Sequence, residues 1–318
     1  MSGSIPEERL QDHGLREVLL LVAEDFDLLD LAGPLQVLAT ANGARNAYRT
    51  VTASASGGPV AAACGLCVAT RPLASARPAR IDTLLVIGGA RGGPRRALVD
   101  WLGRHGAAIR RVCGIGPGMD ALGEAELIAP SDRALHWLAS PAPPAEAKRA
   151  PIAVRRGSVW TCAGAAAAID LSLALVAEDL GRPAALAVAE ALAVPVWRHP
   201  AEPQVSATLA LQVRLGAPFA DLLRRMRADL AGDLRVETLA DWCNMSPRTF
   251  ARRFASETGT TPAAAAAALR LETAEALLDA GGATLKQVAG LCGFGSELSL
   301  RRALGRSPRS AQRRRRRG

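Results

Sequence analysis

Arginine is the residue whose positions in this chain point most directly to chemistry. The segments LADWCNMSPRTFARRF (239–254) and VAGLCGFGSELSLRRAL (288–304) present arginines near their ends. These arginines are Arg248, Arg252 and Arg253 in the first segment, and Arg301 and Arg302 in the second. A guanidinium group can bind a phosphate or the edge of a guanine through two parallel hydrogen bonds. Arginines placed in this way predict contact with nucleic acid.

The two segments are one pattern repeated at an offset of 49 residues, as from Ala240 to Ala289. Each copy has a short helix, a turn bearing Asn244 or Gly293, an N-capping serine and a second helix, with one extra residue after the second turn. We therefore predict two helix-turn-helix units. The stretch between them, 262–280, predicts a helix of about 28 Å that sets the two reading helices about one DNA turn apart.

Cysteine is a second reactive residue type. Six cysteines scattered along the chain predict reduced cytosolic thiols rather than a disulfide framework. Cys64 and Cys67 have CxxC spacing, but a zinc site needs a second ligand pair, and CGLCVAT is typical of a strand. We expect both to be buried structural thiols. The histidines have no metal-ligand spacing, so no metal and no cofactor is predicted.

Ser131, Asp132 and His136 have the residue types of a hydrolytic triad. Nearness along the chain does not establish the geometry that a triad needs, so this hypothesis is disfavoured. His136, next to Trp137, is equally typical of a hydrogen-bonded structural histidine.

The elements of the first two hundred residues predict an α/β domain. Continuous apolar runs, typical of strands covered on both faces, occur at 18–23, 83–87 and 109–115. Helical periodicity follows at 28–39, 95–104, from Met119 and at 165–180, and the proline-rich stretch 140–151 predicts a surface loop. Strand, turn and helix in this recurring order predict a doubly wound, flavodoxin-like parallel sheet, whose ligands bind at the carboxyl ends of the strands.

Length and charge agree with two domains of different character. The chain has 318 residues, and 49% of them are apolar. A chain of this length is longer than a single hydrophobic core usually organises. The net charge of +9 lies entirely in residues 211–318, with 19 basic and 10 acidic groups, and residues 301–318 hold nine arginines and no acid. This distribution of charge predicts a polyanionic partner, with nucleic acid the leading candidate. The polar N-terminus and the interrupted apolar runs favour neither export nor membrane insertion, so we expect a cytoplasmic protein.

The first domain carries a resemblance in LLDLAGPLQVL (28–38), DTLLVIGGARGG (82–93), RRVCGIGPGMDALGEAEL (110–127), ALHW (134–137) and SVWTCAGAAAAIDLSLALVAEDLG (158–181). These motifs resemble the PfpI/ThiJ-type class I glutamine-amidotransferase-like domain, in the form fused to a DNA-binding domain in GlxA-type regulators. In the enzymes of that superfamily the strand-to-helix turn, or elbow, holds a nucleophilic cysteine.

In this chain Gly116 stands where the resemblance implies the cysteine. Cys113 lies three residues earlier, inside the strand, whereas the acid facing the elbow is kept as Asp30. A carboxylate without a nucleophile performs no covalent chemistry, so we expect that this protein is not an enzyme. The residues expected around the elbow either form a pocket for a small polar ligand or serve only the packing of the turn and strands. They are Asp30, Gly89, Gly116, Pro117, Gly118 and Thr161.

The last hundred residues resemble the AraC family, through RVETLADWCNMSPRTFARRF, ETGTTP, RLETAEALL and KQVAGLCGFGS. The resemblance implies eight DNA-facing residues on or beside the two reading helices. They are Arg248, Thr249, Ala251, Arg252, Ser296, Leu298, Ser299 and Arg302. The sequence departs from the family after LRRA, where about four residues are missing. The second reading helix is therefore expected to be about one turn short, and Ala251 and Leu298 cannot hydrogen-bond to bases.

The predicted order is a disordered N-terminus (1–14), a non-catalytic PfpI/ThiJ-like domain (15–200), a linker (201–216), an AraC-type DNA-binding domain (217–310) and a polyarginine tail (311–318). This organisation predicts a transcription regulator that binds double-stranded DNA. A small-molecule effector, a second copy in a homodimer and RNA polymerase are the other expected partners, and no membrane is expected. The alternatives are a PfpI/ThiJ-type hydrolase or hydratase, and a degenerate regulator that binds DNA weakly. We expect the tail to add only sequence-independent phosphate attraction.

Overall fold

The computed structural model describes residues 14–43, 46–89, 96–129, 150–194, 197–215 and 219–306. Two compact units divide the chain: residues 1–147 with 152–200, and residues 148–151 with 201–318. Several sequence predictions fall outside the described residues. They concern the N-terminal segment up to residue 13, residues 131–149 with Ser131, Asp132, His136 and Trp137, and the tail 311–318.

The first unit is built on an eight-stranded sheet of order β3-β4-β2-β1-β5-β6-β8-β7. Its strands are β1 (Arg16–Val22), β2 (Tyr48–Ser54), β3 (Gly58–Ala61), β4 (Cys67–Pro72), β5 (Ile81–Ile87), β6 (Arg111–Ile115), β7 (Ala153–Arg156) and β8 (Val159–Cys162). The six inner strands run parallel, and β3 and β7 pair antiparallel at the two edges. The predicted flavodoxin-like α/β fold is confirmed, although β2 and the edge strands were not foreseen.

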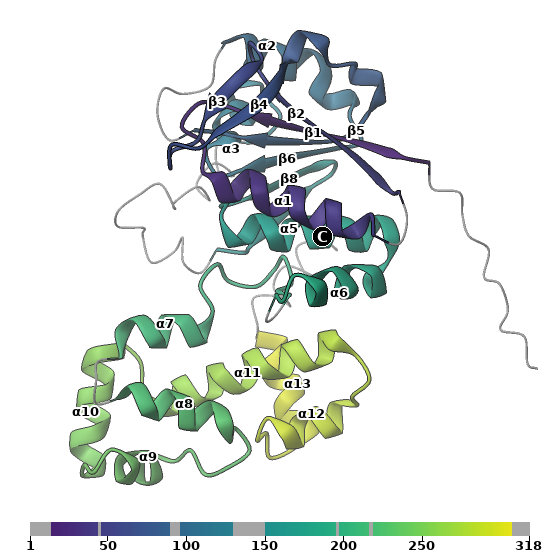
Figure 1. Ribbon diagram of the computed structural model, residues 1–318. Helices are drawn as coiled ribbons and strands as arrows, with labels where there is room; N and C mark the ends of the chain where they lie inside the picture. The colour runs from purple at the N-terminus through teal and green to yellow at the C-terminus, as the bar shows by residue number, and fades with distance from the viewer. Residues whose placement is uncertain are drawn as a thin grey trace, which may run out of the picture. The chain divides into compact units, whose positions relative to one another are not determined.

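Helices cover both faces of this sheet, as doubly wound topology requires. One face packs on α1 (Leu28–Ala41), α5 (Ala166–Leu180) and α6 (Arg182–Ala191), and the other on α2 (Arg96–His105) and α3 (Gly118–Glu124) (Figure 1). The central strands read as unbroken apolar runs because both of their faces are buried. Their carboxyl ends lead into the turns that position the elbow.

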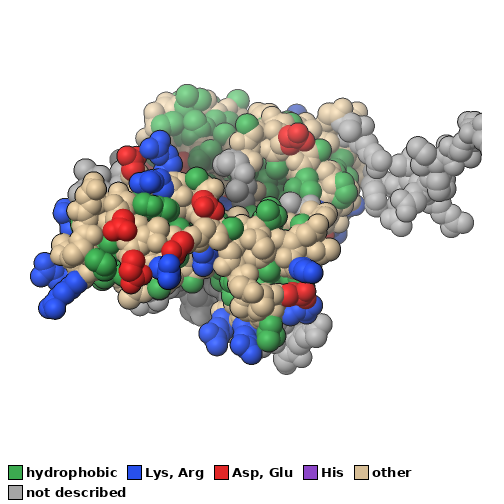
Figure 2. All heavy atoms as spheres, turned by 90° about the horizontal axis from the view of Figure 1, so that it is seen from below, with side chains coloured by type: hydrophobic (Ala, Val, Ile, Leu, Met, Phe, Trp, Pro, Cys, Tyr) green, Lys and Arg blue, Asp and Glu red, His purple; other side chains and the backbone are tan. Residues whose placement is uncertain are grey.

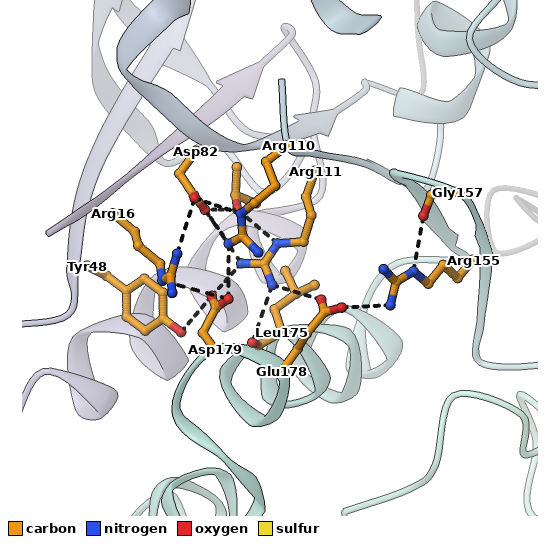
Figure 3. Close-up of polar contacts among 11 residues, drawn as sticks. Arg16, Tyr48, Asp82, Arg110, Arg111, Arg155, Gly157, Leu175, Glu178 and Asp179 are labelled. Carbon is orange, nitrogen blue, oxygen red and sulfur yellow. Dashed lines mark hydrogen bonds and ion pairs between the residues drawn. The ribbon is translucent and has the colours of Figure 1, made fainter. Parts of the chain in front are cut away.

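Polar side chains are buried at the opposite end of the sheet (Figure 3). Asp179, at the end of α5, accepts hydrogen bonds from Tyr48 at 3.0 Å, from Arg110 at 3.0 Å and from Arg111, and Arg16 Nε lies 3.7 Å from its Oδ1. The side chains of Arg111 and Asp179 are 2% and 1% exposed. Burial and the Asp179 charge raise the pKa of Tyr48, so its hydroxyl stays a donor.

The prediction that Cys64 and Cys67 are buried is wrong, because both are exposed. Cys67 begins β4, and Cys64 lies in the turn that joins β3 to β4 at the outer edge of the sheet. The turn of this hairpin lies at the edge of the sheet, where the two cysteines stay exposed. The sequence CGLCVAT does not reveal that the strand it forms lies near a sheet edge.

The described helices of the second unit are α7 (Ala207–Arg214), α8 (Ala220–Ala228), α9 (Val236–Trp242), α10 (Pro247–Thr258), α11 (Pro262–Ala280), α12 (Leu285–Leu291) and α13 (Glu297–Arg306). Helix α7 lies in the stretch expected to be a linker. Thr208 there donates to Glu272 of α11 at 2.8 Å, and Arg214 donates to the carbonyl of Thr258. Among the described residues, no helix has the length and apolar content needed to cross a bilayer.

Candidate nucleic-acid interface and elbow

Helices α9 and α10 form the first helix-turn-helix unit. The turn holds Asn244 at a φ of +54°, and the Met245 N–H donates to the Ala240 carbonyl at 3.0 Å. Ser246 caps α10 by accepting from the Thr249 N–H, and Pro247 occupies the first turn, where no intrahelical donor is needed. Phe250 and Phe254 of α10 are buried against Phe219, which fixes the opposite face of α10 toward solvent.

Helices α12 and α13 repeat this arrangement. Gly293 has a φ of +72° at the turn, and the Phe294 N–H donates to the Ala289 carbonyl at 2.8 Å, matching the bond from Met245 to Ala240. Ser296 accepts from the Ser299 N–H at 3.1 Å, and Leu300 is buried at the position of Phe250. The repeat recognised in the sequence is therefore also a repeat of hydrogen bonds.

The arginines on the two reading helices fall into two groups. Arg253 is bound by Glu257 at 3.0 Å, and Arg301 by Glu297 at 2.7 Å. The exposed guanidinium groups of Arg248, Arg252 and Arg302 form no ion pair with another described residue. In the space-filling view from below, Lys and Arg side chains stand in separate groups with acids between them (Figure 2). Arg306, at the end of α13, is also exposed and has no ion pair with another described residue, so these four arginines are able to take phosphate or base partners.

The other predicted DNA-facing residues differ in availability. Thr249 and Ser296 are exposed at the starts of the reading helices, and Ala251 is half-buried. Leu298 is 56% exposed. The half-buried Ser299 uses its hydroxyl locally, since it donates to the Ser296 carbonyl at 2.7 Å and accepts from the Ser296 N–H at 3.2 Å.

Arg270 joins the two helix-turn-helix units, and sequence reasoning missed it. Its side chain, from the middle of α11, donates to the carbonyls of Leu230 at 2.8 Å and Gly232 at 3.1 Å, just before the first unit. A Cβ added at Gly293, in the turn of the second unit, would lie 2.9 Å from Arg270 Nε and 2.2 Å from the Leu230 oxygen. Arg270 is the single arginine of the alanine-rich helix α11, and this isolated position could have indicated its structural role.

The elbow lies where β6 ends and α3 begins. Gly116 has a φ of +52°, and its N–H donates to the Cys162 carbonyl at 3.0 Å. A Cβ added there would lie 2.9 Å from Asp30 Oδ2. The structure thus brings residue 116 and Asp30 together, although residue 116 has no side chain to react.

Asp30 is buried at 2% exposure within α1. Its Oδ1 accepts from the Ala165 N–H, and Gly164 leaves room for the carboxylate, since a Cβ there would lie 2.6 Å from Oδ1. Burial raises the pKa of Asp30 to about 7, partly opposed by the Ala165 hydrogen bond. The carboxyl group therefore changes its protonation near neutral pH.

The remaining elbow residues serve close backbone packing. A Cβ on Gly118 would lie 2.0 Å from the Val86 carbonyl oxygen, and one on Gly89 would lie 1.7 Å from that of Glu24. Pro117 immediately precedes α3. Thr161 pairs with Gly114 and is 3% exposed, with no hydrogen-bond partner for its hydroxyl among the described residues. Because neighbouring side chains alternate between sheet faces, Thr161 points away from the α1 face that carries Asp30.

The nearby thiols are not placed for nucleophilic chemistry. Cys113 is fully buried within β6, and burial raises its pKa to about 12. Burial also raises the pKa of Cys162. Both groups remain neutral thiols at physiological pH. No cluster of three or more His, Cys, Asp or Glu side chains suited to a metal ion occurs among the described residues.

Comparison with known proteins supports both units. The model of the DJ-1/PfpI family matches residues 16–178, and a helix-turn-helix domain model matches residues 239–314. The transcriptional regulator GlxA of Rhizobium meliloti is 26% identical over 317 residues, which cover 94% of this chain and 96% of GlxA. The regulators GbdR and CdhR of Pseudomonas aeruginosa are 27% and 29% identical, covering 89% and 87% of this chain and 79% and 84% of their own lengths. The chain therefore belongs to the DJ-1/PfpI family and carries in addition a C-terminal helix-turn-helix domain of the AraC type.

Proposed function

We propose that this protein is a transcriptional regulator that binds double-stranded DNA through α10 and α13. The observation that carries the proposal is the repeated unit itself. Two capped helices are built on the same turn and present Arg248, Arg252 and Arg302 without internal ion pairs. Names of full-length relatives as transcriptional regulators support it. Thr249, Ala251, Ser296, Leu298 and Ser299 complete the proposed contact surface.

The DJ-1/PfpI domain acts in this proposal as a sensing or dimerising domain rather than as an enzyme. Gly116 offers no nucleophile to Asp30, and Cys113 is a buried neutral thiol. Asp30, Gly89, Gly116, Pro117 and Gly118 at the elbow stay a proposed small-ligand region, whereas Thr161, proposed with them, lies on the opposite face of the sheet. The homodimer and the contact with RNA polymerase belong to the same proposal, because regulators of this kind act on promoters as assemblies.

Selection of bound sequences from a random DNA pool by the full-length protein tests the DNA-binding function. We expect one enriched motif, and Arg248→Ala with Arg252→Ala should abolish its enrichment. Arg253→Ala is the matched control, since that side chain is already bound by Glu257 and should leave the motif unchanged. A pool without enrichment, or a product released from an ester or amide substrate that depends on the elbow, would overturn the proposal.

A further inference from the structure

A hollow of about 310 Å³ opens on the first unit beside β2, away from the elbow. Leu19 of β1 and Val51 and Ala53 of β2 contribute apolar side chains to its lining. Glu17 and Arg49 also line it, and both stand near the amino ends of their strands, whereas the elbow follows the carboxyl end of β6. The hollow and the elbow are therefore different places on the sheet.

The strand pairing explains why this region is open. β4 pairs with β2 only at Ala53–Arg71 and Ser54–Pro72. The earlier part of β2, 48–52, therefore has a strand partner on its β1 side alone (Figure 1). After β4 the chain turns through η1 (Leu73–Ser75) and η2 (Pro78–Arg80), which form the rim of the hollow.

The lining is strongly cationic. Arg49, Arg71, Arg77 and Arg80 line the hollow, and Glu17 is the one acid in the lining. Arg49 lies 3.8 Å from Glu17, whereas Arg71, Arg77 and Arg80 form no ion pair with another described residue. These four arginines come from β2, β4 and the η2 segment, and three of their positive charges have no ion-pair partner among the described residues. The four side chains are exposed, so solvent screens much of their mutual repulsion, and a bound anion would lower it further.

We propose that this hollow binds a small molecule bearing at least two oxyanion groups, carboxylate or phosphate. Guanidinium groups recognise both oxyanions through paired hydrogen bonds, and several arginines lining one hollow favour a ligand with more than one such group. The volume lies at the lower end of the range for small-molecule sites and is far too small for a DNA duplex. That this ligand acts as an effector at a site separate from the elbow rests on the regulatory function proposed above.

Calorimetric titration of the full-length protein at constant ionic strength tests the site. Citrate and inorganic pyrophosphate are the probes, so that the two arms separate carboxylate from phosphate, and acetate is the single-charge comparison. We expect saturable binding of one or both probes and none of acetate. Each of Arg71→Ala and Arg80→Ala should weaken binding by about tenfold, the loss typical of a hydrogen bond to a charged group. Lysine at either position should restore part of the affinity.

Arg104→Ala is the matched control, because this exposed arginine of α2 lies outside the hollow. The control should bind the probes as the wild type does. An equal loss in Arg104→Ala, or no saturable binding of either probe by the wild type, would overturn the site. If Arg71→Ala weakens DNA binding while neither probe binds, the surface is a DNA contact and the proposal is wrong. DNA selection by the wild type without probes is unaffected by these outcomes, so failure of the site and failure of the regulatory function are distinguished.

Discussion

At the scale of single residues, Gly116 decides what the elbow can do. The fold still delivers position 116 to a buried acid, but glycine supplies only a backbone N–H and a left-handed conformation. The acid then has nothing to activate. The pair Gly116 and Asp30 is consequently the most informative place for substitution in the first unit.

Gly116→Cys should lower the free energy of unfolding, by about 1–3 kcal/mol, because a side chain there adopts a positive φ and crowds Asp30 Oδ2. Gly103→Ala in α2 is the control: its Cβ would meet no atom within 4 Å, so helix propensity should raise stability by up to about 1 kcal/mol. Urea denaturation measures both. In a Cys64→Ser/Cys67→Ser background, the new thiol should react with iodoacetamide faster than buried Cys113 and Cys162. Unchanged stability would show that the elbow is roomier than described.

Asp30 should make stability depend on pH near neutrality. Burial raises its pKa from 3.8 to about 7, so the folded protein holds this proton to higher pH than the unfolded chain does. The protonated Asp30 therefore contributes its full stabilisation of the folded state below about pH 4, and this contribution is lost as the pH rises to about 7. Asp30→Asn should remove that loss, and its melting temperature relative to wild type should rise between pH 5 and 8. Parallel melting curves across this range would contradict the assignment.

At the scale of elements, buried charges tie the end of α5 to the amino ends of β1, β5 and β6. Asp179 is the shared carboxylate, and Arg16, Arg110 and Arg111 converge on it from the strands or from the residues just before them (Figure 3). Such a network holds the end of α5 against the sheet, because each buried charge is costly to leave without a partner.

Asp179→Asn should destabilise the first unit by about 3–5 kcal/mol, since it leaves the buried Arg111 with an incomplete set of counter-charges. Asp100→Asn on α2 breaks an exposed pair with Arg96 and should cost at most about 1 kcal/mol. Urea denaturation followed by tryptophan fluorescence compares the two variants. Equal effects would mean that the buried network contributes no more than a surface pair.

The turn of the second helix-turn-helix unit is fixed by contacts from outside that unit. Gly293→Ala should destabilise the unit and weaken DNA binding, because its Cβ would lie 2.2 Å from the Leu230 carbonyl oxygen. Gly290→Ala, three residues earlier in α12, meets no atom within 4 Å and should be neutral or stabilising. Circular dichroism and fluorescence anisotropy with a selected DNA site measure both changes. Equal behaviour of the two variants would contradict the role of the turn.

At the scale of the whole molecule, the two reading helices present unequal chemistry to the DNA that we propose they bind. α10 presents Arg248 and Arg252, whereas α13 presents Arg302 beside the exposed Leu298. An arginine that binds guanine discriminates between bases by about 1–3 kcal/mol, and an arginine on phosphate shifts every site alike. The first unit should therefore dominate sequence recognition.

We expect Arg252→Ala to erase base preference within one half of the site and Arg302→Ala to weaken binding uniformly. Competition against singly substituted operators distinguishes these outcomes. The salt dependence of binding gives a second test. A lost phosphate contact reduces by about 0.9 the steepness of a plot of the logarithm of the DNA-binding constant against the logarithm of the salt concentration. A base-specific loss in Arg302→Ala without one in Arg252→Ala would assign the dominant unit the other way round.

Local patterns in the sequence were sufficient for the architecture. Unbroken apolar runs predicted β1, β5 and β6, and the repeated motif predicted both helix-turn-helix units with α11 between them, because burial and capping leave periodic signals in neighbouring residues. The absence of a thiol at Gly116 was likewise readable in the chain itself. These features depend on residues close together in sequence.

Tertiary structure alone decided which distant residues meet. The exposure of Cys64 and Cys67 depends on β3 and β4 standing at a sheet edge, and the link from Arg270 to Leu230 joins residues forty positions apart. The gathering of four arginines around one hollow beside β2 also follows from strand order, which places β4 next to β2. Strand order is set by packing over the whole core, and no periodicity within a short segment records it.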